Sequence, residues 1–344
     1  MKLATSALLL ASWIIYPLSF IVPKNPKIWI FIGWHKNKER EIFADNAKYL
    51  FLHVTHNCPD IRAVWIGADK KISALLRAAG YESWSIDSWS GIYYSLRAGY
   101  TIIDAVMKTI NWRYSGGSRT VQLWHADGLK KLDLAPVRSW SHWRQVLLEP
   151  SRLKRFGLFI SSSRYMAQKF VGPSFGASEN QIKITGLPRY DAFFRTEAGM
   201  AIDQHEELKQ KMAAARAGGA RRLIFYAPTF RRGQAADSPL RQLNLPALDQ
   251  FLADRNDFLF ISLHPKFSTA NWRPDGELKR VFFINPDFDK YPLLPNFDLV
   301  ITDYSSICLE FLLLDKPTIF YVYDLDDYRH NPGLPEEFWQ LVPF

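Results

Sequence analysis

The chain alternates short apolar runs with longer stretches in which apolar and polar residues are mixed. Runs of this kind are typical of buried strands, and the stretches between them are long enough for helices. The first series of predicted strands covers 27–33, 61–67, 99–104, 120–124, 157–162 and 182–186, and the second covers 222–227, 257–263, 280–285, 297–302 and 317–321. Because near-continuous apolar strands that alternate with helices form parallel sheets covered on both faces, the pattern predicts two doubly wound α/β domains.

A polar, alanine-rich segment separates the two series of strands. It reads RTEAGMAIDQHEELKQKMAAARAGGARR and has a glycine pair near its end. This composition predicts a helix followed by a linker, and a ligand cleft between the two domains is expected. The predicted parts are an N-terminal helix over 1–24, a first α/β domain over 25–195, the helix and linker over 196–220, and a second α/β domain over 221–344.

The N-terminal segment is uncharged. No charged residue occurs from Leu3 to Val22, and Lys24 and Lys27 follow. The stretch is long enough to cross a bilayer, but Pro17 and several hydroxyl residues interrupt its apolar character. An interfacial helix is favoured over a membrane span, and a buried helix or a signal peptide is the third alternative. Since the first two alternatives both attach the protein to a membrane, we expect it at the cytoplasmic face of the plasma membrane, peripheral or monotopic.

Charge is the feature of the composition that adds most to this picture. The 344 residues include 43 lysines and arginines against 34 aspartates and glutamates, so the formal net charge is +9. This balance suits an anionic partner such as a nucleic acid, a membrane surface or a phosphorylated substrate. Nucleic acid is the least favoured of these, because the sequence contains no recognised nucleic-acid-binding motif. The two cysteines, Cys58 and Cys308, are too few for a disulfide framework or a cysteine-based zinc site and suit a reducing compartment.

Polar and basic residues gather in the loops that follow five of the predicted strands. In doubly wound sheets, ligands bind beyond the carboxyl ends of the strands, so these loops form the candidate site. They read HADGLK at 125–130, GLPRYD at 186–191, APTFRR at 227–232, HPK at 264–266 and TDYSS at 302–306. A single histidine in such a loop is more often structural than catalytic, and an arginine pair is usually solvated. Together, the five loops predict a basic, hydroxyl-rich cleft with two histidines and few carboxylates.

The loop TDYSS allows two interpretations. It has four polar residues among five, directly before a predicted helix. One hydroxyl or carboxylate is enough to cap the first turn of a helix. Several hydroxyls beside the free N–H groups of that turn also suit a bound phosphate. Capping and phosphate binding both remain open from this stretch alone.

Several enzyme classes lose their best support because their motifs are absent from the sequence. It contains no G-x-x-x-x-G-K-[ST] loop, G-x-G-x-x-G fingerprint, G-x-S-x-G elbow or H-E-x-x-H pair. The acidic residues Asp324, Asp326 and Asp327 suit a helix start better than a metal site. The loops therefore favour binding of a diphosphate and stabilisation of a leaving phosphate without an obligatory metal.

Six blocks cover most of the chain beyond the first helix, and the last of them is the most specific. They are FADNAKYLFLHV (43–54), LWHADGLKKL (123–132), TGLPRYDAFF (185–194), IFYAPTFR (224–231), ISLHPKF (261–267) and ITDYSSICLEFLLLDKPTIFYVYDLDDYR (301–329). In this order, the blocks resemble the CDP-glycerol glycerophosphotransferase family, the polymerases and primases of teichoic acid and related capsule synthesis. The resemblance implies a GT-B fold: two Rossmann-like domains, the first for the acceptor and the second for the CDP donor, with a membrane-associated N-terminal part.

The resemblance also implies an activity. Family members transfer glycerol phosphate from CDP-glycerol to an acceptor hydroxyl and release CMP, which implies CDP-glycerol, a lipid-linked or polymer acceptor and a membrane surface as partners, and no cofactor. A GT-B glycosyltransferase or a ribitol-phosphate transferase with another nucleotide-activated donor is the alternative enzyme. An inactive module that binds nucleic acid or lipid is the alternative outside the enzymes.

The resemblance assigns roles to residues by motif. It makes His125 the general base on the acceptor hydroxyl, a role that suits a neutral imidazole near pH 7. It makes His264 the histidine that faces the donor pyrophosphate. The candidates for substrate binding are Gly128, Lys130, Arg189, Asp191, Thr229, Arg231, Lys266, Thr302, Asp303, Ser305 and Ser306.

Two departures from the family pattern affect these expectations. The family loop usually reads H-G-T-P-L-K, whereas Asp127 adds a negative charge here, close to where an anionic acceptor is expected to enter. The chain ends at Phe344, where family members usually continue with another helical stretch. A truncated donor domain is therefore part of the expectation.

Overall fold

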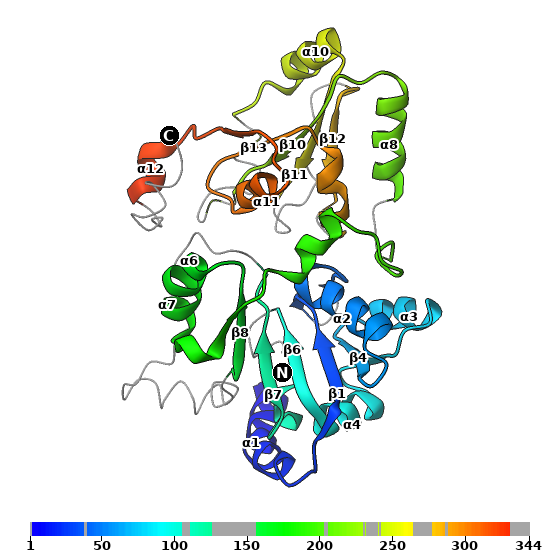
Figure 1. The fold of residues 1–344 in the computed structure, drawn as a ribbon, viewed down its shortest axis with the longest axis vertical. Helices are drawn as coiled ribbons and strands as arrows, with labels where there is room; N and C mark the ends of the chain where they lie inside the picture. The colour runs from blue at the N-terminus through cyan, green and yellow to red at the C-terminus, as the bar shows by residue number, and fades with distance from the viewer. Residues whose placement is uncertain are drawn as a thin grey trace. The chain divides into compact units, whose positions relative to one another are not determined.

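The computed structural model describes residues 2–37, 40–104, 111–125, 156–202, 206–229, 231, 240, 242–263, 277–285 and 288–330. The chain divides into two compact units, one over Met1–Asp203 and the other over Gln204–Phe344. Each unit is built on one parallel sheet with helices packed against it (Figure 1). The predicted α/β class with two parallel sheets is confirmed.

The sheet of the first unit has seven strands in the order β5-β4-β1-β6-β7-β8-β9. The strands are β1 (Asn25–Ile32), β4 (Arg62–Gly67), β5 (Ser83–Ser85), β6 (Ala98–Ile103), β7 (Arg119–Gln122), β8 (Leu158–Ser161) and β9 (Ile182–Ile184). All six strands of the first predicted series are present. The apolar runs do not reveal β5, because it has only three residues and two of them are serines. They also miss the antiparallel pair β2 (His35–Asn37) and β3 (Arg40–Glu41).

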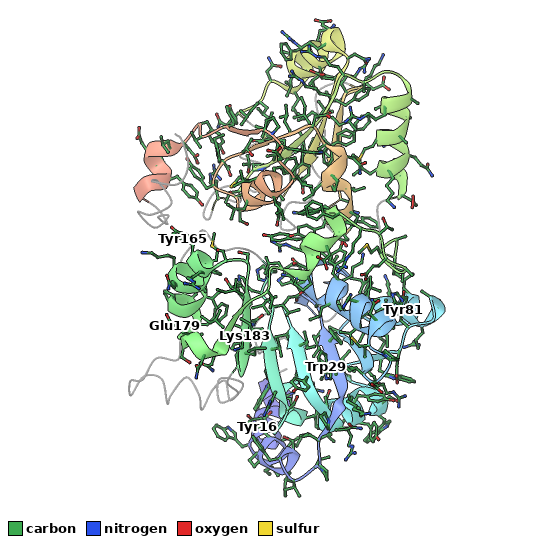
Figure 2. The ribbon with its side chains drawn as sticks, in the orientation of Figure 1. Tyr16, Trp29, Tyr81, Tyr165, Glu179 and Lys183 are labelled. Atoms are coloured by element: carbon green, nitrogen blue, oxygen red, sulfur yellow. The ribbon has the colours of Figure 1, made fainter. Side chains whose placement is uncertain are left out.

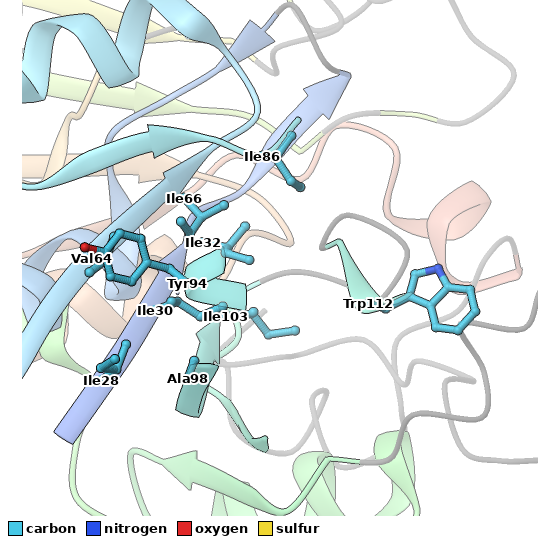
Figure 3. Close-up of a cluster of buried hydrophobic side chains, with 10 residues drawn as sticks. All are labelled: Ile28, Ile30, Ile32, Val64, Ile66, Ile86, Tyr94, Ala98, Ile103 and Trp112. Atoms are coloured by element: carbon cyan, nitrogen blue, oxygen red, sulfur yellow. The ribbon is translucent and has the colours of Figure 1, made fainter. Parts of the chain in front are cut away.

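The two faces of β1 bury different side chains, as the alternation of a strand requires. Ile28, Ile30 and Ile32 belong to one cluster of buried residues, shown in Figure 3. Phe31 is also fully buried, and its ring centroid lies 5.4 Å from that of Phe51 on helix α2 (Asp45–Asn57). Burial on both faces explains why β1 reads as a near-continuous apolar run.

The first unit also contains the N-terminal helix. Its helices are α1 (Lys2–Ser19), α2, α3 (Lys70–Ala78), α4 (Trp89–Arg97), η2 (Trp112–Tyr114), α6 (Arg164–Met166), η4 (Ala167–Val171), α7 (Gly172–Phe175), η5 (Glu179–Gln181) and η6 (Pro188–Phe193). Tyr16 of α1, labelled in Figure 2, lies with its ring centroid 5.2 Å from that of Trp112. The Ser19 hydroxyl accepts a hydrogen bond of 2.9 Å from the N–H of Gly116. Within the described ranges, no helix is both long and apolar enough to cross a membrane.

The second unit has a five-stranded sheet in the order β12-β11-β10-β13-β14. The strands are β10 (Arg222–Ala227), β11 (Asp257–Ser262), β12 (Val281–Ile284), β13 (Leu299–Thr302) and β14 (Thr318–Phe320), and the helices are α8 (Glu206–Ala217), α10 (Leu245–Arg255), η8 (Tyr291–Asn296), α11 (Ile307–Leu313) and α12 (Leu325–His330). All five strands of the second predicted series are present. The helix predicted in the alanine-rich segment is α8.

Candidate active site

His125 follows β7 through a strained turn. The preceding residue, Trp124, has a φ of +53°, which is a genuine outlier for a bulky side chain. The N–H of Trp124 donates to the side-chain oxygen of Gln122 at 2.8 Å, and the rings of Trp124 and His125 lie 4.2 Å apart between centroids. The turn ends the strand two residues before the predicted end at 124 and brings His125 to the carboxyl edge of the sheet.

One hydrogen bond of the His125 ring indicates its tautomer. Its Nδ1 atom lies 2.8 Å from the backbone carbonyl oxygen of Asp104. Since a carbonyl oxygen only accepts, Nδ1 carries the proton and donates, and Nε2 of the neutral ring has a free lone pair. No described residue forms a hydrogen bond with Nε2. The imidazole thus presents an unprotonated nitrogen, as a general base requires.

The electrostatic surroundings of His125 favour its neutral form. Burial lowers the pKa of His125; Asp45 and the hydrogen bond to Asp104 oppose this shift, while Arg189 adds to it. The carboxyl group of Asp104 is itself fully buried, and burial together with Asp45 raises its pKa well above the usual range. A raised pKa favours the neutral form of the Asp104 carboxyl group, which adds no negative charge beside the imidazole in that form.

Arg189 lies directly beside the histidine turn but points into the protein. Only 1% of its surface is exposed, and Nη1 donates to Asp45 Oδ1 at 2.9 Å and to the carbonyl oxygen of His125 at 2.6 Å. The structure therefore brings two predicted site residues together, with Arg189 bound to the backbone of the other. Asp191, also on η6, is half-exposed and pairs with Arg195.

Asp303 is the centre of the polar network in the second unit. Its carboxylate accepts hydrogen bonds from the backbone N–H of Thr229 at 2.9 Å and of Tyr304 at 2.6 Å. It also pairs with Arg231, whose Nη2 atom lies 2.9 Å from Oδ2. Asp303 is 1% exposed, so these internal partners surround it. The network ties together the loops that follow β10 and β13.

Arg231 is buried between two carboxylates and a group of tyrosines. Its guanidinium donates to both carboxylate oxygens of Asp324, at 2.6 and 2.9 Å. The rings of Tyr304, Tyr323 and Tyr328 lie 4.9 to 5.4 Å from its central carbon. Burial disfavours the charge of Arg231, but the hydrogen bonds to Asp324 and the charge of Asp303 outweigh it, so its pKa is raised. The guanidinium is a fixed cation that holds three loops.

The hydroxyl groups after β13 differ in how they are used. Thr302 is buried and donates to the carbonyl oxygen of Ala227 at 2.7 Å. Ser306 is the N-cap of α11 but makes no side-chain capping bond. Ser305 accepts from the N–H of Ile307 at 3.5 Å, which is long for a hydrogen bond. Capping therefore explains neither serine well, and their role in phosphate binding stays a prediction.

Three further observations complete the account of the predicted residues. The Thr229 hydroxyl is buried and has no hydrogen-bond partner among the described residues. The acidic residues Asp326 and Asp327 lie in the first turn of α12, as the helix-start interpretation predicts. In the part of the chain that is described, no group of three or more histidine, cysteine, aspartate or glutamate side chains is arranged to hold a metal ion. The other predicted site residues, Gly128, Lys130, His264 and Lys266, lie outside the described residues.

Asp45 and Asn46 are functional candidates that a search of the loops beyond the carboxyl ends of the strands does not find. They begin α2, far in sequence from the histidine turn. Asn46 donates to the carbonyl oxygen of Trp124 within that turn, and Asp45 pairs with Arg189 beside it. The feature of the sequence that points to them is their place in the block FADNAKYLFLHV, where two polar residues open an amphipathic helix. That signal alone is equally typical of an ordinary helix start.

Comparisons with known proteins agree on one family. The family model described as CDP-Glycerol:Poly(glycerophosphate) glycerophosphotransferase matches residues 14–343. The teichoic acid glycerol-phosphate primase of Bacillus subtilis (strain 168) is 29% identical over 239 residues, which cover 66% of this chain and 56% of the primase. The teichoic acid poly(ribitol-phosphate) polymerase of Bacillus spizizenii (strain ATCC 23059 / NRRL B-14472 / W23) is 33% identical over 188 residues, 51% of this chain and 28% of the polymerase. The chain thus spans about half the length of the primase, or less in the case of the polymerase.

The fold is shared with a solved structure. The structure of the wall teichoic acid polymerase TagF superimposes with a TM-score of 0.70 over 99% of this chain and 84% of that chain, at 19% sequence identity. At this identity the likeness concerns the fold.

Proposed function

Because the chain belongs to the CDP-glycerol:poly(glycerophosphate) glycerophosphotransferase family, we propose that it transfers glycerol phosphate from CDP-glycerol to an acceptor hydroxyl and releases CMP. The product is a teichoic-acid-like or capsular polymer of the cell envelope. The observation that carries the proposal is the 2.8 Å contact between Nδ1 of His125 and the Asp104 carbonyl oxygen, from which we infer that Nδ1 is protonated and that Nε2 can act as a base. We further propose that the fold is GT-B-like, with 25–195 as the acceptor domain and 221–344 as the donor domain.

The proposed reaction is an in-line displacement at the β-phosphorus of CDP-glycerol. The acceptor hydroxyl gives its proton to Nε2 of His125, and its oxygen forms a bond to phosphorus. The bond from phosphorus to the bridging oxygen breaks, and CMP leaves with that electron pair. His125 begins this step neutral, since burial lowers its pKa. The base then returns its proton to solvent or to the departing phosphate.

For the donor, we propose the loops that follow β10 and β13. The hydroxyls of Ser305 and Ser306 are partly exposed and weakly used within the protein, which leaves them available for phosphate oxygens. Arg231 and Asp303 are buried and engaged with each other, so they support these loops from behind. This division separates the ligand-facing candidates from the residues that shape the loops.

Donor choice is the point at which a second candidate function has support. The ribitol-phosphate polymerase of B. spizizenii is the relative with 33% identity over 188 residues, so CDP-ribitol is the alternative donor. Purified protein is incubated with CDP-glycerol, CDP-ribitol or a UDP-sugar, together with a lipid-linked acceptor, and nucleotide release is measured. We expect CMP from CDP-glycerol. Release from CDP-ribitol alone would reassign the donor, and UMP or UDP from the sugar would favour a glycosyltransferase.

Membrane attachment through α1 completes the proposal. Ile14, Leu18, Phe20 and Ile21 are exposed, although the same segment packs on the first unit through Tyr16 and Ser19. Large exposed apolar side chains in this segment suit a peripheral contact with lipid. The test is sedimentation with anionic vesicles of the intact protein and of a variant with serine at 14, 18 and 21. Equal binding of both would exclude this surface as the anchor.

A further inference from the structure

The side chain of Asn46 joins two turns that are far apart in the sequence. It is completely buried at the start of α2. Its Nδ2 donates to the carbonyl oxygen of Trp124 at 2.7 Å, and its Oδ1 accepts from the backbone N–H of Arg189 at 3.1 Å. Both halves of the amide are used, so only an amide satisfies both partners in this geometry.

Asn46 acts on the part of the chain that orients His125. The carbonyl oxygen of Trp124 is bound by Asn46, and the next carbonyl oxygen, that of His125, is bound by Nη1 of Arg189. The imidazole is fixed in turn by the Asp104 carbonyl oxygen at 2.8 Å. Two successive carbonyl groups and the ring are thus each held by a different element of the unit.

The same residues maintain two strained backbone conformations. Trp124 has a φ of +53° and Asp45 a φ of +63°, and neither is a glycine. Asp45 Oδ1 accepts from the N–H of Asn46 at 2.9 Å and from Arg189 Nη1 at 2.9 Å. Such conformations persist only where the surroundings determine them from several sides, and they concentrate at functional sites.

We propose that Asn46 is a positioning residue that keeps His125 in the orientation and tautomer needed for proton abstraction. The proposal rests on the proposed function in one respect, the role of His125 as base. Arg189 contributes to the same support, with its own backbone placed by Asn46. For Arg189, the proposal adds a role in holding the base to the predicted role in substrate binding.

Asn46→Asp is the sharpest variant, because it preserves shape and the acceptor for Arg189 while removing the donor to Trp124. Asn46→Ala removes both contacts. Asn57 is the matched control, since it lies at the exposed end of the same helix and can be changed in the same two ways. Circular dichroism of each variant verifies folding.

The measured quantities are kcat and KM for CDP-glycerol, in the wild-type and the His125→Ala backgrounds. We expect the Asn46 variants to lower kcat roughly 10- to 100-fold, because a displacement of about 1 Å can cost about 10²-fold. KM should stay within about twofold, since the donor residues lie elsewhere. In the His125→Ala background the same changes should cost nothing more, because a positioning residue has no effect once its base is gone. Equal losses in both backgrounds, or no loss relative to the Asn57 variants, would overturn the proposal.

A readout independent of activity separates this proposal from the proposed function. The ¹⁵N spectrum of the histidine rings, with the His125 signal identified by its absence in His125→Ala, should show a proton on Nδ1 in the wild type. Asn46→Asp should give a mixture of tautomers. If the wild type releases no nucleotide, the proposed function fails, and the spectrum still decides on Asn46. An unchanged His125 signal in Asn46→Asp would exclude the positioning role.

Discussion

The buried guanidinium of Arg231 gives the prediction that depends most directly on the geometry of the second unit. Replacing it by methionine removes the partner of Asp303, which is 1% exposed, and both hydrogen bonds to Asp324. Breaking a buried ion pair from one side usually costs about 3–5 kcal/mol, because a buried charge is left without compensation. We therefore expect Arg231→Met to lower the free energy of unfolding of this unit by about that amount.

Arg216 provides the matched control in the same unit. It pairs with Asp298 at 2.8 Å, but the two side chains are 39% and 38% exposed. Exposed pairs are worth about 0–1 kcal/mol, so Arg216→Met should have a small effect. Urea unfolding followed by circular dichroism, with hydrogen exchange to assign the change to the second unit, measures both variants.

The pH dependence tests the cause of the Arg231 effect. Without the guanidinium, the pKa of a buried carboxyl rises, so acid neutralises it. The loss of stability in Arg231→Met should therefore shrink as the pH falls from 7 to about 5. An effect below about 1 kcal/mol at pH 7, equal to that of the control, would refute the reasoning. A deficit that grows in acid would refute it as well.

Three further predictions concern single groups. His125→Ala should lower turnover by about 10² to 10⁴ with donor affinity preserved by calorimetry, and near-normal turnover would make His125 structural. Burial raises the pKa of Glu41 to about 7, despite hydrogen bonds to Asp69 and Trp65 that lower it. Since the folded state then binds more protons than the unfolded state, stability should fall by about 3 kcal/mol from pH 4.5 to about 7. Unfolding at a series of pH values should show a flatter profile for Glu41→Gln, and an equal slope would contradict this origin. Changing Ser305 and Ser306 together to alanine should weaken CDP-glycerol binding and cost at most about 1 kcal/mol of stability, and unchanged affinity would exclude them as phosphate ligands.

The strands were the part of the fold most accessible to prediction, because burial on both faces leaves a continuous apolar run. β10 (Arg222–Ala227) coincides with its predicted range. The strand Ser83–Ser85 was not predicted, because a short edge strand contains few apolar residues. The predicted strand at 120–124 ends two residues too late, since the left-handed conformation of Trp124 ends the ladder and no local pattern signals it.

The candidate site was predictable at the level of loops but not of contacts. The position of loops beyond the carboxyl ends of strands selects those containing His125 and Arg189. The structure brings these two residues within hydrogen-bonding distance. The bond between Asn46 and Arg189 joins residues 143 positions apart, and nothing in a single sequence specifies such a pairing. The sequence also does not show which way a polar side chain points. Thr302 donates to the buried carbonyl oxygen of Ala227, although its loop suits a ligand.

The parallel arrangement of the first sheet has a consequence for the proposed reaction at a membrane. Helix α1 packs where strands begin, with Ser19 bound to Gly116 just before β7, whereas His125 follows the other end of β7 (Figure 1). Trp29 and Arg119 lie at the same level, both opposite Tyr100, and Ile32 and Gln122 both lie opposite Ile103, so the two ends of β7 are three residue steps apart. At about 3.3 Å per residue, that is about 10 Å along the strand. On the proposed attachment through α1, the proposed base follows the end of β7 that is farther from lipid, so an acceptor hydroxyl would have to extend along the sheet to meet it.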